Sequence, residues 1–262
     1  MSYQSLLLDI DGAVATVTLN RPSARNAMDR QLRTELKHAI DALNGDSAIR
    51  CIVLAASGAG FCAGTDLMER DEDADEDGYV TKMLKQEYHT LMASIAKGDK
   101  PVIAAVNGAA AGIGASLALA CDMIVMAEDA FFYSAFGAIS LIPDGGLHKH
   151  LLINLGPQKA FEMIALSQRL DAATSQQMGM ANRVVPSEEL LSSAQALAAQ
   201  LANCAPLTLK HAKQVLRFAE DHDLFATMEE ESVQQNVCFT SEDFKEGTRA
   251  FFEKRAPVFK GN

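Results

Sequence analysis

Residues 106–122 read VNGAAAGIGASLALACD, and six of these residues are alanine and three are glycine. Apart from Asp122, the stretch holds almost no side chain that could act as an acid or a base. Glycine occurs where a backbone turns sharply or approaches another group closely, and alanine favours tightly packed helices. We therefore expect the backbone of this stretch, rather than its side chains, to be the functional part.

Known nucleotide-binding and nucleophile motifs do not account for this stretch. A strand that runs into Gly112-Ile113-Gly114 and then a helix is the setting of a dinucleotide site. Three residues later that fingerprint requires Gly or Ala, whereas this chain has Leu117. The sequence contains neither a P-loop nor a G-x-S-x-G elbow, so no motif makes Ser116 a nucleophile.

The pattern of apolar residues predicts short strands and helices in a repeated order. Two β-like segments flank a turn at Asp11-Gly12 and predict a hairpin over residues 5–19. Strand, strand and helix then recur before residue 165, which indicates an α/β fold of stacked ββα turns. The pattern is helical from about residue 187, so we expect a core over residues 1–186 and a helical oligomerisation region over residues 187–262. The predicted helices span residues 27–46, 80–97 and 112–120, and the predicted strands span residues 49–58, 100–108, 121–129 and 130–136.

The amino-acid composition and net charge indicate which kinds of binding partner are unfavourable. With 262 residues, 48% hydrophobic and 22% charged, the chain is typical of globular proteins. A net charge of −11 argues against nucleic acid, because phosphate binding requires clustered Lys and Arg. Apolar stretches end before roughly 18 residues and the first residues lack a basic segment, so we expect a cytoplasmic protein with no membrane partner. The five cysteines and six histidines form no metal-ligand pattern, which predicts no metal site.

A second strand leads into glycines at residues 53–67, VLAASGAGFCAGTDL. Two such turns can present backbone N–H groups to a common point, which is how an oxyanion hole is built. The chain resembles the crotonase superfamily, the enoyl-CoA hydratases and isomerases, over nearly its whole length. The segments that carry this resemblance are LNRPSARNAM (19–28), GAGFCAGTDL (58–67), VNGAAAGIGASLALACD (106–122), IPDGG (142–146) and FFEKRAPVF (251–259).

The resemblance implies a fold, a ligand and an assembly. The implied fold is a crotonase-like spiral of stacked ββα turns whose helical C-terminal region forms a homotrimer, commonly as a dimer of trimers. The implied substrate is an acyl-CoA thioester, in which coenzyme A is part of the substrate and no further cofactor is needed. The implied oxyanion donors are the backbone N–H groups of Ala63 and Ile113, with substrate-binding neighbours at Cys62, Gly64 and Gly112.

The acid or base decides the reaction. Hydratases of the superfamily use two glutamates, and the matching positions hold Ser116 and Phe136, which cannot do that work. Asp144 matches the position where several isomerases carry one catalytic carboxylate. A lone carboxylate among apolar residues can have a raised pKa and shuttle one proton. We therefore expect an isomerase that converts 3-enoyl-CoA to 2-enoyl-CoA.

Several alternatives stay open from the sequence. Another single-acid reaction such as ring-type isomerisation, a hydratase with an unidentified acid, and a CoA-ester-binding protein without catalysis all fit the pattern. Asp144 could also be a turn or helix N-cap residue before Gly145 and Gly146.

The resemblance also implies contacts outside the two turns. It places Arg25 near the CoA phosphates, Asp66 in the stretch that holds the adenine through backbone groups, Phe136 beside the acyl group, and Phe251 and Lys254 against the CoA of a neighbouring subunit. The acidic run over residues 69–77 holds seven carboxylates, which would oppose the phosphates if it closed over CoA. We expect this run to point to solvent and to be mobile.

Overall fold

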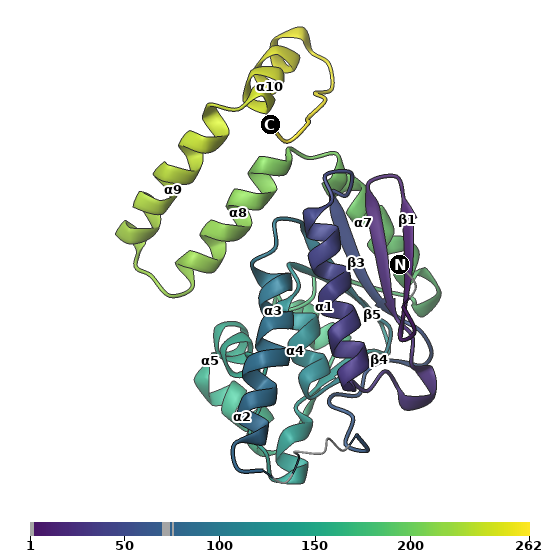
Figure 1. Cartoon of the computed structure of the whole chain (residues 1–262). Helices are drawn as coiled ribbons and strands as arrows, with labels where there is room; N and C mark the ends of the chain where they lie inside the picture. Colours follow the sequence, from purple (N-terminus) through teal and green to yellow (C-terminus); the bar gives the residue numbers. More distant parts are fainter. Residues whose placement is uncertain (1–2, 70–73, 75) are drawn as a thin grey trace.

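The computed structural model describes residues 3–69, 74 and 76–262 as two sheets, surrounding helices and a C-terminal helical arm (Figure 1). The strands are β1 (Leu6–Asp11), β2 (Val14–Leu19), β3 (Cys51–Ala56), β4 (Gly60–Cys62), β5 (Val102–Val106), β6 (Ala109–Ala111), β7 (Met123–Ala127), β8 (Phe131–Tyr133), β9 (Arg169–Asp171) and β10 (Arg183–Val185). The α-helices are α1 (Arg30–Gly45), α2 (Tyr79–Met83), α3 (His89–Ala96), α4 (Ile113–Ala120), α5 (Leu147–Ala165), α6 (Ala172–Gln177), α7 (Leu190–Ala202), α8 (Pro206–Ala219), α9 (Leu224–Phe239) and α10 (Glu242–Glu253). Short 3-10 turns η1 (Pro22–Ala24), η3 (Ala135–Ile139) and η4 (Ser187–Glu189) and a π-helical turn η2 (Leu84–Tyr88) complete the described elements.

The large sheet has the strand order β1-β2-β3-β5-β7-β10. The predicted hairpin is confirmed, since β1 and β2 are antiparallel with Leu6 opposite Leu19. The other pairs in this sheet are parallel. Parallel strands covered on both faces are apolar throughout, as in β3 (CIVLAA) and β5 (VIAAV). Helices α1, α3 and α4 cover one face and α7 covers the other (Figure 1).

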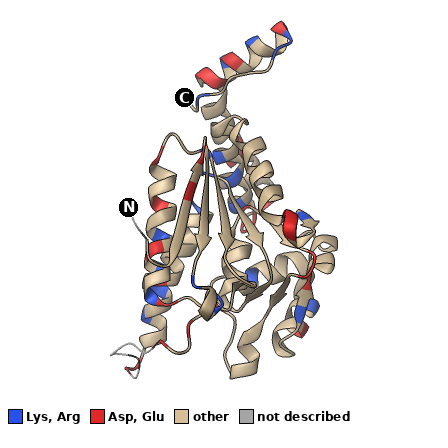
Figure 2. Cartoon of the chain, turned by 90° about the vertical axis from the view of Figure 1, so that its right-hand side faces the viewer, with Lys and Arg blue, Asp and Glu red and all other residues tan. Residues whose placement is uncertain are grey.

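Charged side chains lie mainly on the helices and loops around this sheet. Figure 2 shows few charged residues on its strands, the exceptions being two acids in β1 and one arginine in β10. This distribution is expected for a sheet buried between two layers of helices, because an unpaired charge is costly to bury.

The chain alternates between the two sheets. The strands β3, β5 and β7 are neighbours in the large sheet, and the strands that follow them, β4, β6 and β8, are neighbours in a small sheet of order β4-β6-β8-β9. A helical segment follows each pair of strands, which confirms the predicted stacking of ββα turns. The alternation places the ends of β4 and β6 side by side, with Gly60 opposite Ala109.

The C-terminal arm consists of α8, α9 and α10, which extend away from the sheets (Figure 1). Buried Lys213 ties α8 to the core through an ion pair of 2.7 Å with Asp122. The predicted division at residue 187 falls before α7, yet α7 packs on the large sheet and the arm begins only at α8. No helix in the described ranges is long and apolar enough to cross a membrane.

Candidate active site

Two glycine turns, one after β4 and one after β6, approach each other. Gly64 has a φ of +104° and Gly112 a φ of +54°, in the region that favours glycine. A methyl group on Gly64 would lie 3.1 Å from the carbonyl oxygen of Ala111 and 3.8 Å from the Cα of Gly112. The two segments identified in the sequence are thus in backbone contact, and their small residues permit it.

The first turn exposes the N–H of Thr65 rather than that of Ala63. The N–H of Ala63 donates to the carbonyl of Arg25 at 3.0 Å, which uses its only hydrogen. The carbonyl of Gly64 accepts from the N–H of Met28 at 2.8 Å. A trans peptide directs its N–H opposite to its C=O, so the N–H of Thr65 points away from Met28 and has no acceptor in the described part of the chain. Ala63 therefore does not fit as an oxyanion donor, whereas the N–H of Thr65 could serve as one.

The second turn exposes the N–H of Ile113 at the start of α4. The carbonyl of Gly112 accepts from the N–H groups of Ala115 and Ser116 at 3.0 and 3.3 Å, so it points along the helix. The N–H of Ile113 belongs to the same peptide group and points out of the helix, with no acceptor among residues 3–69, 74 and 76–262. The positive end of the helix dipole lies at this position and favours a negative charge there.

The loop that carries Asp144 packs against the start of α4. The hydroxyl of Ser116 donates to the carbonyl of Asp144 at 2.8 Å. A methyl group on Gly145 would lie 2.4 Å from the Cδ1 of Ile113 and 2.9 Å from the Cβ of Ser116, so a larger residue does not fit. Ser116, at a position where hydratases carry a glutamate, thus holds the Asp144 loop next to Ile113.

The side chain of Asp144 has an unusual environment. Its Oδ1 is buried and has no hydrogen-bond partner among the described residues. This burial raises the pKa of Asp144 to about 6. A carboxylate with such a pKa can accept a proton and return it near neutral pH. The N-cap alternative is wrong, because the residue before α5 is Gly146 and no side chain caps this helix.

Apolar groups border the two turns. The ring of Phe136 lies over Gly112, where a methyl group would be 3.7 Å from the Cζ of Phe136. Cys62 is fully buried and lies under α4, so close that a methyl group on Gly114 would be 2.4 Å from its carbonyl oxygen. Burial raises the pKa of the Cys62 thiol to about 12 and keeps it protonated. The side chain of Cys62 therefore supports the packing of the site and does not line it, contrary to the prediction.

The side chains of two predicted CoA-binding residues, Arg25 and Asp66, differ in whether they are already paired within the chain. Arg25 is exposed, and its guanidinium has no ion-pair partner within the described ranges. Asp66 is occupied, because its carboxylate accepts from the Nη1 of Arg21 at 3.1 Å and from the N–H of Met68 at 3.0 Å. A phosphate could therefore reach Arg25 without breaking an internal ion pair. The carboxylate of Asp66 is occupied, which does not test its expected role, since that role belongs to backbone groups of this stretch.

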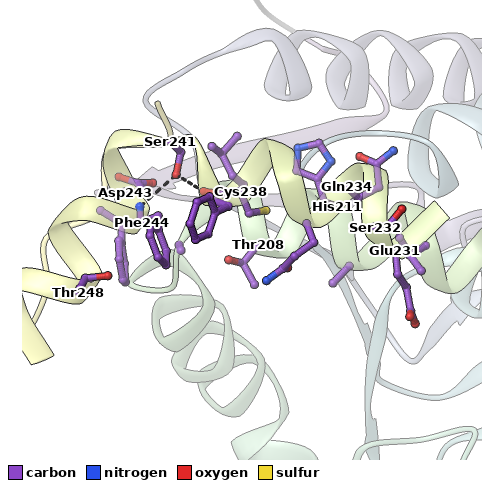
Figure 3. A pocket seen from close by; sticks show the side chains of 18 of the residues that line it. Thr208, His211, Glu231, Ser232, Gln234, Cys238, Ser241, Asp243, Phe244 and Thr248 are labelled. Atoms are coloured by element: carbon purple, nitrogen blue, oxygen red, sulfur yellow. Dashed lines mark hydrogen bonds between the residues drawn. The ribbon is translucent and has the colours of Figure 1, made fainter. Parts of the chain in front are cut away.

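Phe251 and Lys254 lie at the end of α10, at the opposite end of the molecule from β4 (Figure 1). Phe251 is 78% exposed and lines an apolar groove of about 1250 Å³ between α8, α9 and α10. Figure 3 shows Thr208 and His211 of α8, Cys238 of α9 and Phe244 of α10 around this groove. Neither Phe251 nor Lys254 joins the glycine turns of the same chain.

The acidic run departs in part from its prediction. Glu69 does not point to solvent, because its carboxylate accepts from the Nη1 of Arg33 at 2.9 Å and from the N–H of Arg30 at 2.6 Å. Glu76 and Asp77 are exposed. Residues 70–73 and 75 lie outside the described residues.

Comparison with known proteins agrees with this geometry. The family model for enoyl-CoA hydratase/isomerase matches residues 9–262. The chain belongs to the enoyl-CoA hydratase/isomerase family. A 1,2-epoxyphenylacetyl-CoA isomerase of Escherichia coli K12 is 37% identical over 257 residues, 98% of each chain. A probable enoyl-CoA hydratase of Rhodobacter capsulatus is 36% identical over 261 residues, 100% of each chain. An enoyl-CoA hydratase structure from Geobacillus kaustophilus is 35% identical and superposes with a TM-score of 0.92 over 99% of each chain.

Membership of the enoyl-CoA hydratase/isomerase family confirms the expected crotonase fold and an acyl-CoA enzyme. Thr65 could not be identified from the sequence, because the direction of its N–H depends on the pairing of Gly64 and Asp66 with Met28. That pairing joins segments about forty residues apart in the chain, and no local sequence pattern predicts it.

Proposed function

We propose that this enoyl-CoA hydratase/isomerase family member is a double-bond isomerase that converts 3-enoyl-CoA to 2-enoyl-CoA. The observation that carries the proposal is the side chain of Asp144, whose buried Oδ1 has no hydrogen-bond partner among the described residues and whose pKa is raised to about 6 by burial. The two glutamate positions of hydratases hold Ser116, which donates to a carbonyl, and Phe136, which is apolar. A single carboxylate suits a reaction that moves one proton.

The proposed reaction uses the carboxylate and two peptide groups. Asp144 removes a proton from C2 of the 3-enoyl thioester, and the electrons of that C–H bond move onto the thioester oxygen as an enolate. The N–H groups of Thr65 and Ile113 stabilise this oxygen, and removing one such donor typically costs about a hundredfold or more in rate. The enolate then collapses, the C3=C4 bond becomes C2=C3, and Asp144 returns the proton to C4. Atoms and electrons balance without a metal or redox cofactor.

A ring-type isomerisation is the second candidate, and the E. coli relative favours it. That relative, 37% identical, is named for an isomerisation of an epoxide of phenylacetyl-CoA. The same oxyanion donors and a single carboxylate could serve an aryl-CoA substrate. Hydration remains the third candidate, because other relatives are named as probable enoyl-CoA hydratases.

Binding of coenzyme A and assembly complete the proposal. We infer that Arg25 contacts the CoA phosphates, since its exposed guanidinium has no ion-pair partner in the described part of the chain. The exposed apolar residues of α8, α9 and α10 support a homotrimer or a dimer of trimers. In such an assembly Phe251 and Lys254 would approach the CoA of a neighbouring subunit. The expected location is the cytoplasm.

The test combines a substrate panel with one substitution. Purified protein is assayed against 3-enoyl-CoA, 2-enoyl-CoA and aryl-CoA epoxide substrates, and each product is identified by mass spectrometry. Asp144→Asn should lower kcat by about a thousandfold, because general acid–base groups contribute roughly 10²–10⁴ in rate. Its affinity for the saturated ester butyryl-CoA should stay within about twofold of the wild type, since this ester undergoes no proton transfer.

Asp9→Asn is the matched control, because Asp9 is an exposed residue of β1. This control should leave kcat unchanged. A wild-type rate in Asp144→Asn would remove Asp144 from the mechanism. Binding of butyryl-CoA without turnover of any panel member would favour a CoA-ester-binding protein, and a hydrated product would favour a hydratase.

A further inference from the structure

Behind Thr65 lies a buried polar network that the proposed mechanism does not use. The Oγ1 of Thr65 and the hydroxyl of Tyr88 are 2.9 Å apart. Tyr88 is fully buried, and the guanidinium carbon of Arg33 lies 5.1 Å from the centre of its ring. Burial raises the pKa of Tyr88 to about 12, although nearby Arg33 opposes the rise, so the hydroxyl stays protonated. Thr65 is therefore joined by its side chain to the interior between α1 and η2.

Arg33 is the cation at the centre of this network. Only 2% of the residue is exposed. Its Nε donates to Glu87 at 2.7 Å, and its Nη1 donates to Glu69 at 2.9 Å and to the carbonyl of Met28 at 2.8 Å. A buried charge is costly unless it is paired and hydrogen-bonded. These contacts hold Arg33 in place as an anchor, although its buried Nη2 has no hydrogen-bond partner among the described residues.

The residues of η2 contact Arg33 through an irregular helical turn. Residues Leu84–Tyr88 form a π-helical turn between α2 and α3. Such turns are rare and insert one residue into an α-helix, often at functional sites. Here the consecutive residues Glu87 and Tyr88 both contact Arg33.

Met28 connects the anchor to the peptide that carries the oxyanion donor. Its carbonyl accepts from Arg33 and from the N–H of Asp66 at 3.2 Å, and its N–H donates to the carbonyl of Gly64. The peptide group between Gly64 and Thr65 is therefore held by Met28 on its carbonyl side. The side chain of Thr65 is held by Tyr88.

We propose that Tyr88, backed by Arg33, is a positioning residue that orients the N–H of Thr65 toward the thioester oxygen. This inference rests on the proposed use of that N–H as an oxyanion donor. Such a donor acts only when it is pre-aligned with the oxygen on which charge develops. Misplacement of a reacting group by about 1 Å can cost up to a hundredfold in rate. Tyr88 thus acts through Thr65 and does not touch the substrate.

The kinetic test removes each end of the contact between the two side chains. Tyr88→Phe keeps the ring and loses the hydroxyl, and Thr65→Val keeps the N–H and loses Oγ1. Each should lower kcat on the best panel substrate by about tenfold, less than the loss of a donor, and leave KM within about twofold. Tyr88→Phe also removes the weaker contacts of the hydroxyl with the Nη1 of Arg33 at 3.5 Å and the carbonyl of Met28 at 3.4 Å. The double variant should therefore be no worse than Tyr88→Phe, because that substitution already removes the contact with Thr65. Thr65→Ser, which restores a hydroxyl at this position, should recover most of the rate lost in Thr65→Val.

Tyr3→Phe is the matched control, because the Tyr3 hydroxyl bonds His38 at 3.0 Å at an exposed site on α1. It should leave kcat unchanged. Multiplicative losses in the double variant, or a wild-type kcat in Tyr88→Phe, would overturn the inference while leaving the proposed function intact. A rise in KM alone would also overturn it.

A spectroscopic measurement separates this inference from the reaction itself. Infrared spectra of butyryl-CoA labelled with ¹³C at the thioester carbonyl report how strongly the bound carbonyl is polarised. Wild-type protein should shift the band to lower frequency, and Tyr88→Phe should reduce that shift. Equal shifts would refute the role of Tyr88 even if no panel substrate turned over. A bound ester with no shift in the wild type would instead refute the proposed oxyanion hole.

Discussion

The glycine turns are packed within the chain, whereas the C-terminal arm leaves large apolar side chains exposed. Around Gly64 and Gly112, the contacts come from the same chain, including Met28 and Ala111. In the arm, by contrast, Phe251 is 78% exposed and lines an apolar groove. Burying a side chain of this size contributes roughly 2 kcal/mol. The geometry of the turns can therefore be changed by substitutions within one chain. The stability gained by burying the apolar residues of the arm would instead depend on a second molecule that covers them.

The largest combined effect on stability and activity is expected where the two turns are packed most tightly. Gly114→Ala would place a Cβ 2.4 Å from the carbonyl oxygen of Cys62, so α4 must move relative to β4. Overpacking of this kind costs about 3 kcal/mol, which corresponds to roughly 6–12 °C in Tm for a chain of this size. The shift of α4 also displaces the N–H of Ile113, and kcat should fall by about a hundredfold.

Gly45→Ala is the control for this prediction, because a Cβ at Gly45 meets no atom within 4 Å. Thermal unfolding and steady-state kinetics of both variants provide the comparison. If Gly114→Ala had the wild-type Tm and kcat, close contact between the turns would not be needed for either the fold or the activity.

The next effect concerns the ionisation of Asp144. Burial raises the pKa of this carboxyl to about 6, and the proposed base must be ionised to remove a proton. The value of kcat/KM should therefore be constant above about pH 7 and fall about tenfold per pH unit below pH 6. Rates on the best panel substrate, measured from pH 4.5 to 8.5 with enzyme stability checked at each pH, would show this profile.

Stability gives an independent check on the same ionisation. A carboxyl whose pKa is raised in the folded state contributes stability below its unfolded pKa, and this contribution is lost as the pH rises through about 6. The wild type should therefore lose stability relative to Asp144→Asn between pH 4 and pH 7. A midpoint of kcat/KM near pH 4, together with no change in stability relative to Asp144→Asn between pH 4 and pH 7, would mean that the carboxyl is solvated and is not tuned for catalysis.

The parts of the fold with strong periodicity could be predicted from the sequence. The hairpin, α1, β3, β5 and α4 occur where apolar patterns and glycine boundaries placed them. The strands β9 and β10 were missed because three residues are too few to show a period. Helix α5 was also missed, since its apolar residues show little helical amphipathicity and it contains a kink at Gly156.

In the candidate site, residues with a local conformational requirement could be predicted from the sequence, whereas residues that act through long-range contacts could not. Gly64 and Gly112 could be identified because a positive φ selects glycine locally. Thr65, Tyr88 and Arg33 could not, because their roles arise from contacts between β4, η2 and α1, which are distant in sequence. The full burial of Cys62 likewise follows from the position of α4 over β4 and not from its neighbours in the chain.

The smallest effect on kcat is expected from substitutions in the arm. The same substitutions should, however, lower the mass of the assembly in solution. Leu216 and Phe251 are 69% and 78% exposed and both line the groove, so replacing both by aspartate should change the fold of the single chain little. If another copy covers them, each substitution removes roughly 2 kcal/mol of apolar burial, about thirtyfold in the association constant. Light scattering at micromolar concentration should then show a trimer or hexamer for the wild type and smaller species for the variant.

Leu7→Asp, at a residue of β1 that is 53% exposed, is the control outside the arm and should keep the wild-type mass. Dissociation should raise KM for the acyl-CoA ester by a few-fold, because Phe251 and Lys254 would no longer reach a neighbour's CoA, while kcat stays near the wild type. This split is expected because Thr65, Ile113 and Asp144 all belong to one chain. A wild-type protein that is a monomer would refute the assembly and the role of Lys254, and a dissociated variant with a large loss of kcat would show that the turns also depend on a neighbouring subunit.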